Sequence, residues 1–213
     1  MSDNNENIQN ENTQVEDTGV NDVKNIDSDK EIKDRGYYFR EACSWIAVVG
    51  FAIVAAYLIN TFIIVNSYVP TGSMENTIAS KSKIIGLRFS YWFDEPERGD
   101  IIIFKAPDTP ETNYVKRIVG LPGEKIRIED AKIYITPADG GEEFVLEEDY
   151  LKEDWVISTG PYAFEVPEDS YLTLGDNRNT SKDARYWINK YVDKDTILGK
   201  AVICYSPKLY VLD

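Results

Sequence analysis

The stretch that divides this chain is WIAVVGFAIVAAYLINTFIIV, residues 45–65. It contains no charged side chain, and a helix of this length, rising about 1.5 Å per residue, spans the roughly 30 Å hydrocarbon layer of a membrane. A cleavable secretory signal has a shorter apolar run behind a short basic segment, and a buried globular helix shows a polar face. The sequence therefore predicts a transmembrane helix over residues 45–65.

The segment before this helix is acidic and poor in apolar side chains. Residues 1–44 include 11 acidic and 5 basic residues, and such a stretch buries too little apolar surface to offset its ordering entropy. We expect residues 1–44 to be an acidic cytosolic tail, disordered up to about residue 36. Four Lys and Arg residues between 30 and 40 precede the helix, whereas the first cation after it is Lys81. Because cations near a span stay inside, we expect a single-pass protein of the cell membrane with residues 66–213 outside.

The composition of the whole chain excludes several functions. There are 37 acidic and 23 basic residues, a net charge of −14, no histidine and two cysteines. The acidity argues against nucleic acid as a partner, because phosphate binding needs clustered Lys and Arg. The missing histidine excludes Ser-His-Asp and Cys-His catalysis and imidazole metal sites. Cys43 and Cys204 fall on opposite sides of the membrane, so we expect no disulfide, no Cys-based metal site, and a buried, apolar role for Cys204.

The part outside the membrane has the pattern of a β domain. Short runs rich in β-branched and aromatic residues alternate with turn signals that contain Pro, Gly and Asp. The runs lie at residues 101–104, 114–119, 125–128, 132–135, 170–174 and 201–205. The predicted fold is therefore mainly β: a single N-terminal transmembrane helix followed by an extracytoplasmic antiparallel β domain, residues 66–213, for which the resemblance described below implies the catalytic role.

Without histidine, a nucleophile needs another base, and a buried lysine can serve because desolvation lowers its pKa. Ser73 follows Pro70 and Gly72, which favour a turn that exposes its hydroxyl. Strand alternation places Lys116 on the same face as Tyr114 and Ile118. Each residue also has a plain structural interpretation: Ser73 as a turn-stabilising serine, and Lys116 as a lysine with its amine in solvent.

Two further stretches have open interpretations. Residues 87–93 contain four aromatic side chains in seven positions. They either dip into the outer leaflet, where Trp and Tyr are favoured, or form an aromatic patch in the β core. Residues 142–149 form an acidic run that we interpret as a solvated face.

Four blocks together resemble the bacterial type I signal peptidases, the membrane-bound Ser-Lys serine proteases of family S26, and the small insert resembles their Gram-positive form. They are TGSM at 71–74, GDIIIF at 99–104, YVKRIVGLPGE at 114–124 and GDNRNTSKDAR at 175–185, after an N-terminal span. The resemblance covers about residues 45–205 and implies a small variable β insert at 121–169. The chain departs from the family at Asn76, where proline is usual, and at Ala184, where serine is common.

The resemblance implies a role for each matching residue. Ser73 matches the nucleophile and Lys116 the general base. Thr71 and the Ser73 amide match the oxyanion hole. Ser181 matches the hydroxyl that orients the lysine, and Asp183 and Arg185 match a supporting ion pair. The residues implied in substrate binding are Tyr68, Val69, Pro70, Met74, Ile78, Asn113, Tyr114 and Val115.

The implied function is removal of signal peptides from exported preproteins at the membrane surface, without metal or cofactor. The expected partners are signal peptides of secreted preproteins and the lipid bilayer, with the enzyme a monomer. Two alternatives remain: a self-cleaving Ser-Lys protease of the repressor type, and a membrane-anchored, non-catalytic β module.

Overall fold

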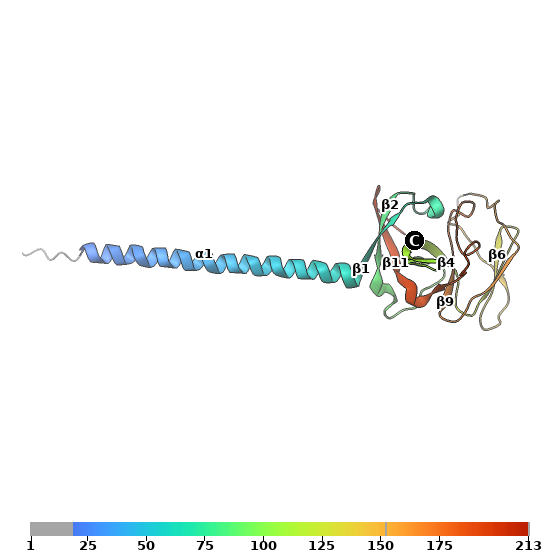
Figure 1. Ribbon diagram of the computed structural model, residues 1–213, viewed down its shortest axis with the longest axis horizontal. Coiled ribbons are helices and arrows are strands. Elements are labelled where there is room, and N and C mark those ends of the chain that lie inside the picture. Colours follow the sequence, from blue (N-terminus) through green and yellow to red (C-terminus); the bar gives the residue numbers. More distant parts are fainter. Residues whose placement is uncertain (1–18, 152, 213) are drawn as a thin grey trace, which may run out of the picture. The chain divides into compact units, whose positions relative to one another are not determined.

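The computed structural model describes residues 19–151 and 153–212. The chain forms two compact units, Met1–Ala55 and Ala56–Asp213. Within the described residues, the first unit is a helix, and the ordered elements of the second are mostly strands (Figure 1).

The helix α1 extends over Gly19–Leu58, and a π-helical turn, η1 (Ile59–Ile63), follows it. The part from Arg35 to Ile63 is long and apolar enough to cross a membrane. The helix begins earlier than expected, because residues 19–36, predicted as disordered, are helical. An existing helix extends without a new nucleus, and no proline interrupts this stretch. The tail predicted at residues 1–18 lies outside the described residues.

The helical part also ends two residues before the predicted end of the span. Ile64 and Val65 already belong to the first strand, where Val65 pairs with Gly86 and is buried. Two consecutive β-branched side chains favour a strand once a partner strand is present. The tertiary pairing therefore decides the boundary.

The strands form two antiparallel sheets. The larger has the order β1-β2-β11-β3-β4-β9-β10, with β12 paired to β11, and the smaller has the order β7-β6-β5-β8. In Figure 1, β6 lies at the opposite side of the β region from β1 and β2. The strand bounds are β1 (Ile64–Val69), β2 (Ser82–Leu87), β3 (Ile101–Ala106), β4 (Thr109–Gly120), β5 (Lys125–Glu129), β6 (Lys132–Thr136), β7 (Phe144–Val145), β8 (Tyr162–Glu165), β9 (Ser170–Leu174), β10 (Val192–Asp193), β11 (Ile197–Ser206) and β12 (Tyr210–Val211).

Short 3₁₀ turns link some of these strands. They are η2 (Gly72–Met74), η3 (Arg88–Tyr91) and η4 (Lys194–Thr196). The antiparallel β prediction is confirmed, and all six predicted runs lie within strands. The smaller sheet, residues 125–165, falls inside the range 121–169 that the resemblance assigned to an insert.

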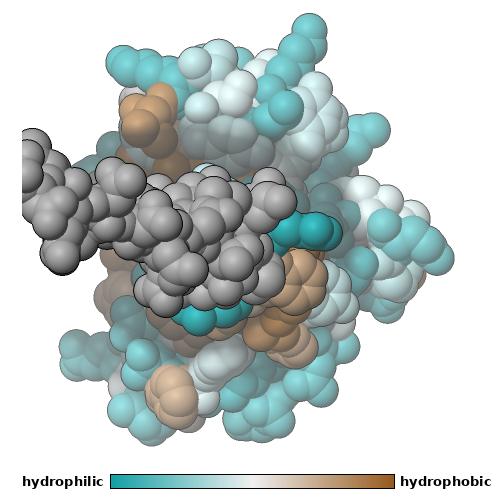
Figure 2. All heavy atoms as spheres, turned by 90° about the vertical axis from the view of Figure 1, so that its left-hand side faces the viewer, coloured by the Kyte–Doolittle hydropathy of each residue, from teal (hydrophilic) through white to brown (hydrophobic). Residues whose placement is uncertain are grey.

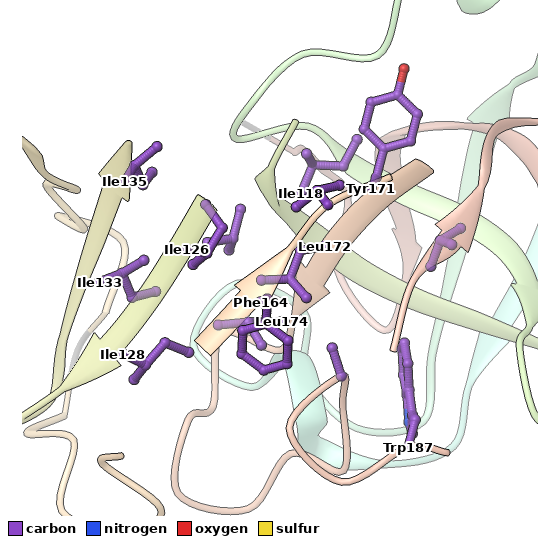
Figure 3. Close-up of a cluster of buried hydrophobic side chains, with 14 of the residues drawn as sticks. Ile118, Ile126, Ile128, Ile133, Ile135, Phe164, Tyr171, Leu172, Leu174 and Trp187 are labelled. Atoms are coloured by element: carbon purple, nitrogen blue, oxygen red, sulfur yellow. The ribbon is translucent and has the colours of Figure 1, made fainter. Parts of the chain in front are cut away.

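Two hydrophobic clusters hold the β region together. The first joins the two sheets: isoleucines of β5 and β6 point toward Leu172 and Leu174 of β9 (Figure 3). The second lies under β1, β2 and β11 and includes Met74 and Ile78 from the turn after β1. Alternate residues of β3 enter different clusters, with Ile102 in the first and Ile103 in the second. β3 and its neighbour β4 are therefore fixed from both faces.

Two single-residue predictions can be compared directly with this structure. Cys204 is fully buried in the second cluster, as predicted, while Cys43 is exposed on α1, and neither forms a disulfide. The aromatic stretch divides: Tyr91 packs against the first cluster and donates a hydrogen bond to Asp100, but Trp92 and Phe93 are 56% and 92% exposed. The core interpretation is thus right for Tyr91 and wrong for Trp92 and Phe93.

Candidate active site

Ser73 lies in the 3₁₀ turn η2, directly after the edge strand β1. The preceding Thr71 is extended, with φ −115° and ψ 160°, and its hydroxyl donates to Ser73 Oγ at 3.5 Å. The next residue, Met74, is fully buried, and its carbonyl accepts hydrogen bonds from the amides of Thr77 and Ile78. Burial of Met74 therefore anchors the turn while the Ser73 side chain stays partly accessible.

Lys116 reaches this serine from the middle of β4. Its Nζ donates to Ser73 Oγ at 2.6 Å and to the Val115 carbonyl at 3.2 Å. It also lies 5.7 Å from the centroid of the Tyr114 ring, which confirms that Lys116 and Tyr114 share a face. Only 4% of Lys116 is exposed, so its amine is not in solvent.

The environment of Lys116 favours its neutral form. Burial lowers its pKa to about 8, although the carboxylates of Asp183 and Asp176 act in the opposite direction. A buried ammonium loses hydration, whereas a neutral amine loses much less. An appreciable fraction of Lys116 is thus deprotonated near neutral pH and can accept a proton from Ser73.

Residues 175–185 contain the residues predicted to support Lys116, which are Ser181, Asp183 and Arg185. Asp183 accepts the Gly175 amide at 3.0 Å and pairs with Arg185 through both carboxylate oxygens, at 2.8 and 2.9 Å. Burial raises the pKa of Asp183, but the Arg185 hydrogen bonds and charge outweigh it, so the pKa lies below its usual range. Ser181 is buried beside Gly175, and its hydroxyl is one of the groups that lower the pKa of Asp183. The structure thus brings Ser181 to the site without showing a bond to Lys116.

A second buried ion pair, not predicted from the sequence, joins three segments around Ser73. Arg117 donates to both oxygens of Asp176, at 3.0 and 2.9 Å. The hydroxyl of Thr77 donates to the same carboxylate at 2.5 Å, and the Asn177 amide donates to the Ser73 carbonyl at 3.1 Å. The turn, β4 and the loop after β9 are therefore locked to one another.

The acidic run contributes to the same network. Glu148 forms a two-point ion pair with Arg178, at 3.0 and 2.6 Å, and both side chains are almost fully buried. The Tyr150 ring lies 4.1 Å from the guanidinium carbon of Arg117, and the Trp155 ring lies about 5 Å from that of Arg178. The solvated-face interpretation of residues 142–149 is therefore wrong for Glu148. No spacing in the sequence pairs it with Arg178, because 30 residues separate them.

The predicted substrate-binding residues fall into two groups. Tyr68, Pro70 and Asn113 are exposed, and Tyr114 is half-buried. The others are packed in the second cluster: Val69, Met74, Ile78 and Val115. Met74 and Ile78 have no exposed surface. A small side chain entering beside Ser73 would therefore meet an apolar floor. Among the described residues, no group of three or more His, Cys, Asp or Glu side chains is arranged to hold a metal.

The two departures noted in the sequence have clear structural settings. Asn76 has a φ of 92°, which proline cannot adopt because its ring fixes φ near −65°. Asparagine tolerates the left-handed region better than most residues. The turn after Ser73 therefore requires a residue other than proline. Ala184 is fully buried in the first cluster, where a hydroxyl would need a partner.

The chain is similar to known proteins over most of its length. The family model described as signal peptidase, peptidase S26, matches residues 42–206. A probable signal peptidase I-2 of Synechocystis sp. is 34% identical, covering 73% of this chain and 69% of the relative. A signal peptidase I of Leptolyngbya laminosa is 36% identical, covering 76% and 78%. A crystal structure of a signal peptidase I from Enterococcus faecalis V583 is 31% identical, with a TM-score of 0.41, covering 50% of this chain and 97% of that one.

Proposed function

This chain belongs to the signal peptidase family S26, and we propose that Ser73 and Lys116 are the nucleophile and general base with which it removes signal peptides. Membership of this family establishes that the chain is a serine peptidase that acts on preproteins carrying signal peptides. The observation that carries the assignment of residues is the 2.6 Å contact between Ser73 Oγ and the buried Lys116 amine. A nucleophile within hydrogen-bond reach of its base is the geometric requirement for this chemistry.

In the acylation step, neutral Lys116 takes the hydroxyl proton as Ser73 Oγ bonds to the scissile carbonyl carbon. The Thr71 hydroxyl and the Ser73 amide stabilise the oxyanion. The C–N bond then breaks, and the leaving amine takes the proton from Lys116. The signal peptide remains as an ester on Ser73.

In the second step, Lys116 is again neutral and takes a proton from a water molecule. The water oxygen attacks the ester carbonyl, the bond to Ser73 Oγ breaks, and Lys116 returns the proton to Ser73 Oγ. Ser181 orients the lysine amine. The Asp183–Arg185 pair supports it indirectly by holding the Gly175 amide, which adjoins Ser181.

The pairing of the strands supports a place for the substrate. Within the described residues, β1 pairs only with β2, and residues 113–115 of β4 pair only with β3. Each therefore has one open edge, and an extended peptide gains backbone hydrogen bonds by adding to such edges. β1 and β4 run parallel, because four antiparallel pairings connect them: β1 with β2, β2 with β11, β11 with β3, and β3 with β4. We propose that the substrate lies between residues 68–71 and 113–115.

The direction and specificity of the substrate follow from this placement. β1 begins directly after the apolar helix and leads to Ser73, so a peptide whose apolar segment is in the membrane runs parallel to β1. Its last residue before the cut lies against the apolar floor of Val69, Met74, Ile78 and Val115, beside Pro70 and Tyr114. Full packing of that floor leaves room only for a small side chain, as small-x-small cleavage sites require.

The same proposal includes the place of the protein in the cell. Membrane association is a property of signal peptidases I, and the apolar helix fits it. We infer that this helix crosses the cell membrane once, that the N-terminus is cytosolic, and that residues 66–213 act as a monomer outside. The cations before the helix support this orientation.

The test is cleavage of a purified preprotein by the full chain in detergent. Ser73→Ala and Lys116→Met are each expected to lower kcat by more than about 10³-fold, because loss of either the nucleophile or its base removes most of the catalysis that the two provide together. Lys132→Met, an exposed lysine of the smaller sheet, is the matched control and should keep wild-type activity. Undiminished cleavage by either active-site variant would overturn the assignment, and an inactive wild type would favour the non-catalytic module.

A further inference from the structure

A polar pocket of about 400 Å³ lies near the point where the chain leaves the apolar helix. Its wall combines asparagines with two cations and residues from the start of β1. The lining residues are Asn60, Ile64, Val65, Asn66, Arg88, Lys105, Asn113 and Leu198. They all belong to the unit Ala56–Asp213. The pocket therefore has no carboxylate in its wall, in a chain whose net charge is −14.

The two cations have no carboxylate partner in the wall of this pocket, although Asp195 lines the neighbouring pocket with Arg88. Arg88 and Lys105 are both half-buried, and neither forms an ion pair within the described part of the chain. Arg88 donates one hydrogen bond, from Nε to the Ile64 carbonyl at 3.2 Å, which holds its guanidinium at the pocket while the terminal nitrogens remain available. Two cations partly removed from water, in a pocket wall that contains no carboxylate, favour the binding of an anion.

The surroundings of the pocket point to the source of that anion. Asn60 is in η1, the last turn of the apolar helical stretch, and its side chain accepts a hydrogen bond from Asn66. Arg88 begins η3, which also contains the exposed Phe89 and is followed by the exposed Trp92. Aromatic rings next to cations, immediately after a membrane span, are typical of the headgroup region.

A second pocket beside the first has a complementary lining. It measures about 370 Å³, shares Arg88 and Leu198 with the first, and is lined by Phe62, Tyr91 and Trp92 together with the charged residues Lys194 and Asp195. The first pocket and a more aromatic one therefore adjoin at Arg88 and Leu198. Figure 2 shows one face of the molecule, on which hydrophobic residues lie among hydrophilic ones. A phospholipid has this combination of an anionic headgroup and an apolar tail.

We propose that Arg88 and Lys105 bind the phosphate of an anionic phospholipid, with the headgroup seated between them. Asn113, at the membrane end of the proposed substrate position, forms part of the same wall. The bound lipid would therefore adjoin the entrance by which a signal peptide passes from the bilayer to Ser73. The lipid site rests on the proposed membrane anchoring but not on the catalytic assignments.

The experiment measures lipid retained by the purified full chain in a neutral detergent, by native mass spectrometry, with phosphatidylglycerol and phosphatidylcholine offered in equal amounts. The wild type should retain phosphatidylglycerol preferentially. In the double variant Arg88→Gln/Lys105→Gln, the ratio of retained phosphatidylglycerol to retained phosphatidylcholine should fall at least about tenfold. The reason is that charge-assisted contacts to phosphate are among the stronger hydrogen bonds. The control Lys125→Gln/Lys132→Gln removes the same charge from the smaller sheet and should retain it.

Three measurements keep the outcome decisive. The charge-preserving variant Arg88→Lys/Lys105→Arg should keep the preference for phosphatidylglycerol. The variant Arg88→Gln/Lys105→Gln should cleave a short soluble peptide within about twofold of the wild-type rate, which shows that this variant is folded. Using Ser73→Ala as the background separates lipid binding from catalysis. The proposal is overturned by equal retention of both lipids, by an unchanged preference in Arg88→Gln/Lys105→Gln, or by displacement of the lipid with millimolar inorganic phosphate. It is also overturned if lipid-free protein instead shows a charge-dependent preference for acidic peptides.

Discussion

Lys116 Nζ lies 2.6 Å from Ser73 Oγ, although 43 residues separate them in the chain. The contact is possible because Met74 and Val115, the neighbours of these two residues, are packed in the same hydrophobic cluster. Ordinary apolar packing thus brings the hydroxyl and the amine together, and the buried position keeps the amine from being fully protonated.

The lowered pKa of Lys116 predicts the pH dependence of cleavage. Because the base must be neutral and its pKa is about 8, kcat/KM should rise with pH, about tenfold per unit below pH 8, and level off above it. The measurement is a pH profile with a short peptide substrate that has no titrating side chains. A profile that is flat between pH 6 and 9, or that bends near the ordinary lysine value of about 10.4, would contradict the assignment.

Gly175 is a position where a single methyl group should disable the site. A Cβ added there would fall on the Ser181 hydroxyl and on the carbonyl oxygen of Ser73. The Ser73 carbonyl is held by the Asn177 amide, so it has little freedom to move away. We expect Gly175→Ala to lower kcat by at least about a hundredfold, because a misplacement near 1 Å has that effect.

The control for this change is Gly50→Ala, since no atom lies within 4 Å of a Cβ added at Gly50. It should leave both kcat and KM unchanged. Full activity of Gly175→Ala would show that the loop after β9 can shift without harming the serine. In that case the proposed support of Lys116 by Ser181 would have to be abandoned.

Glu148 should matter for stability as well as for activity. Its pair with Arg178 is nearly excluded from solvent, and Arg178 also donates to the Gly175 carbonyl at 3.0 Å. Glu148→Gln leaves a buried guanidinium without its counter-charge, which costs about 3–5 kcal/mol. For a domain of this size the melting temperature should fall by on the order of 10 °C, with reduced cleavage at temperatures well below it.

Glu143→Gln is the matched control, because Glu143 lies in the same acidic run and its pair with Arg127 is about 40% exposed on both sides. An exposed pair contributes about 0–1 kcal/mol, so this variant should melt close to the wild type. Equal melting temperatures for the two variants would mean that residues 142–149 do not brace the site.

The sequence predicted the parts of the site that local chemistry and chain order reveal. Local patterns alone left Ser73 and Lys116 open to plain structural interpretations, and the order of the four blocks that resemble the family singled them out. The pairs Arg117–Asp176 and Arg178–Glu148 could not be predicted, because each joins segments at least 30 residues apart and depends on tertiary packing. The sequence of an acidic run does not reveal whether one of its side chains is buried.

The fold shows the same division. Six strands with strong β-branched runs were predicted, but β7, β10 and β12 are two residues long and exist only as partners of longer strands. The start of β1 inside the apolar stretch follows from its pairing with β2, which hydropathy does not register. Local propensity thus predicts the framework, while pairing decides the edges on which the proposed substrate site depends.

Asn76 offers the last prediction, since its φ of 92° lies in the left-handed region. Glycine adopts this conformation without cost, whereas proline is excluded from it. We expect Asn76→Gly to retain most of the activity. Asn76→Pro, although it restores the residue usual in the family, should lower kcat, because the turn that holds Thr77 against Asp176 would have to re-form. Cleavage assays and melting temperatures of both variants decide it: an Asn76→Pro enzyme as active and stable as the wild type would show that the turn adapts, and that Thr77 is not held through this backbone conformation.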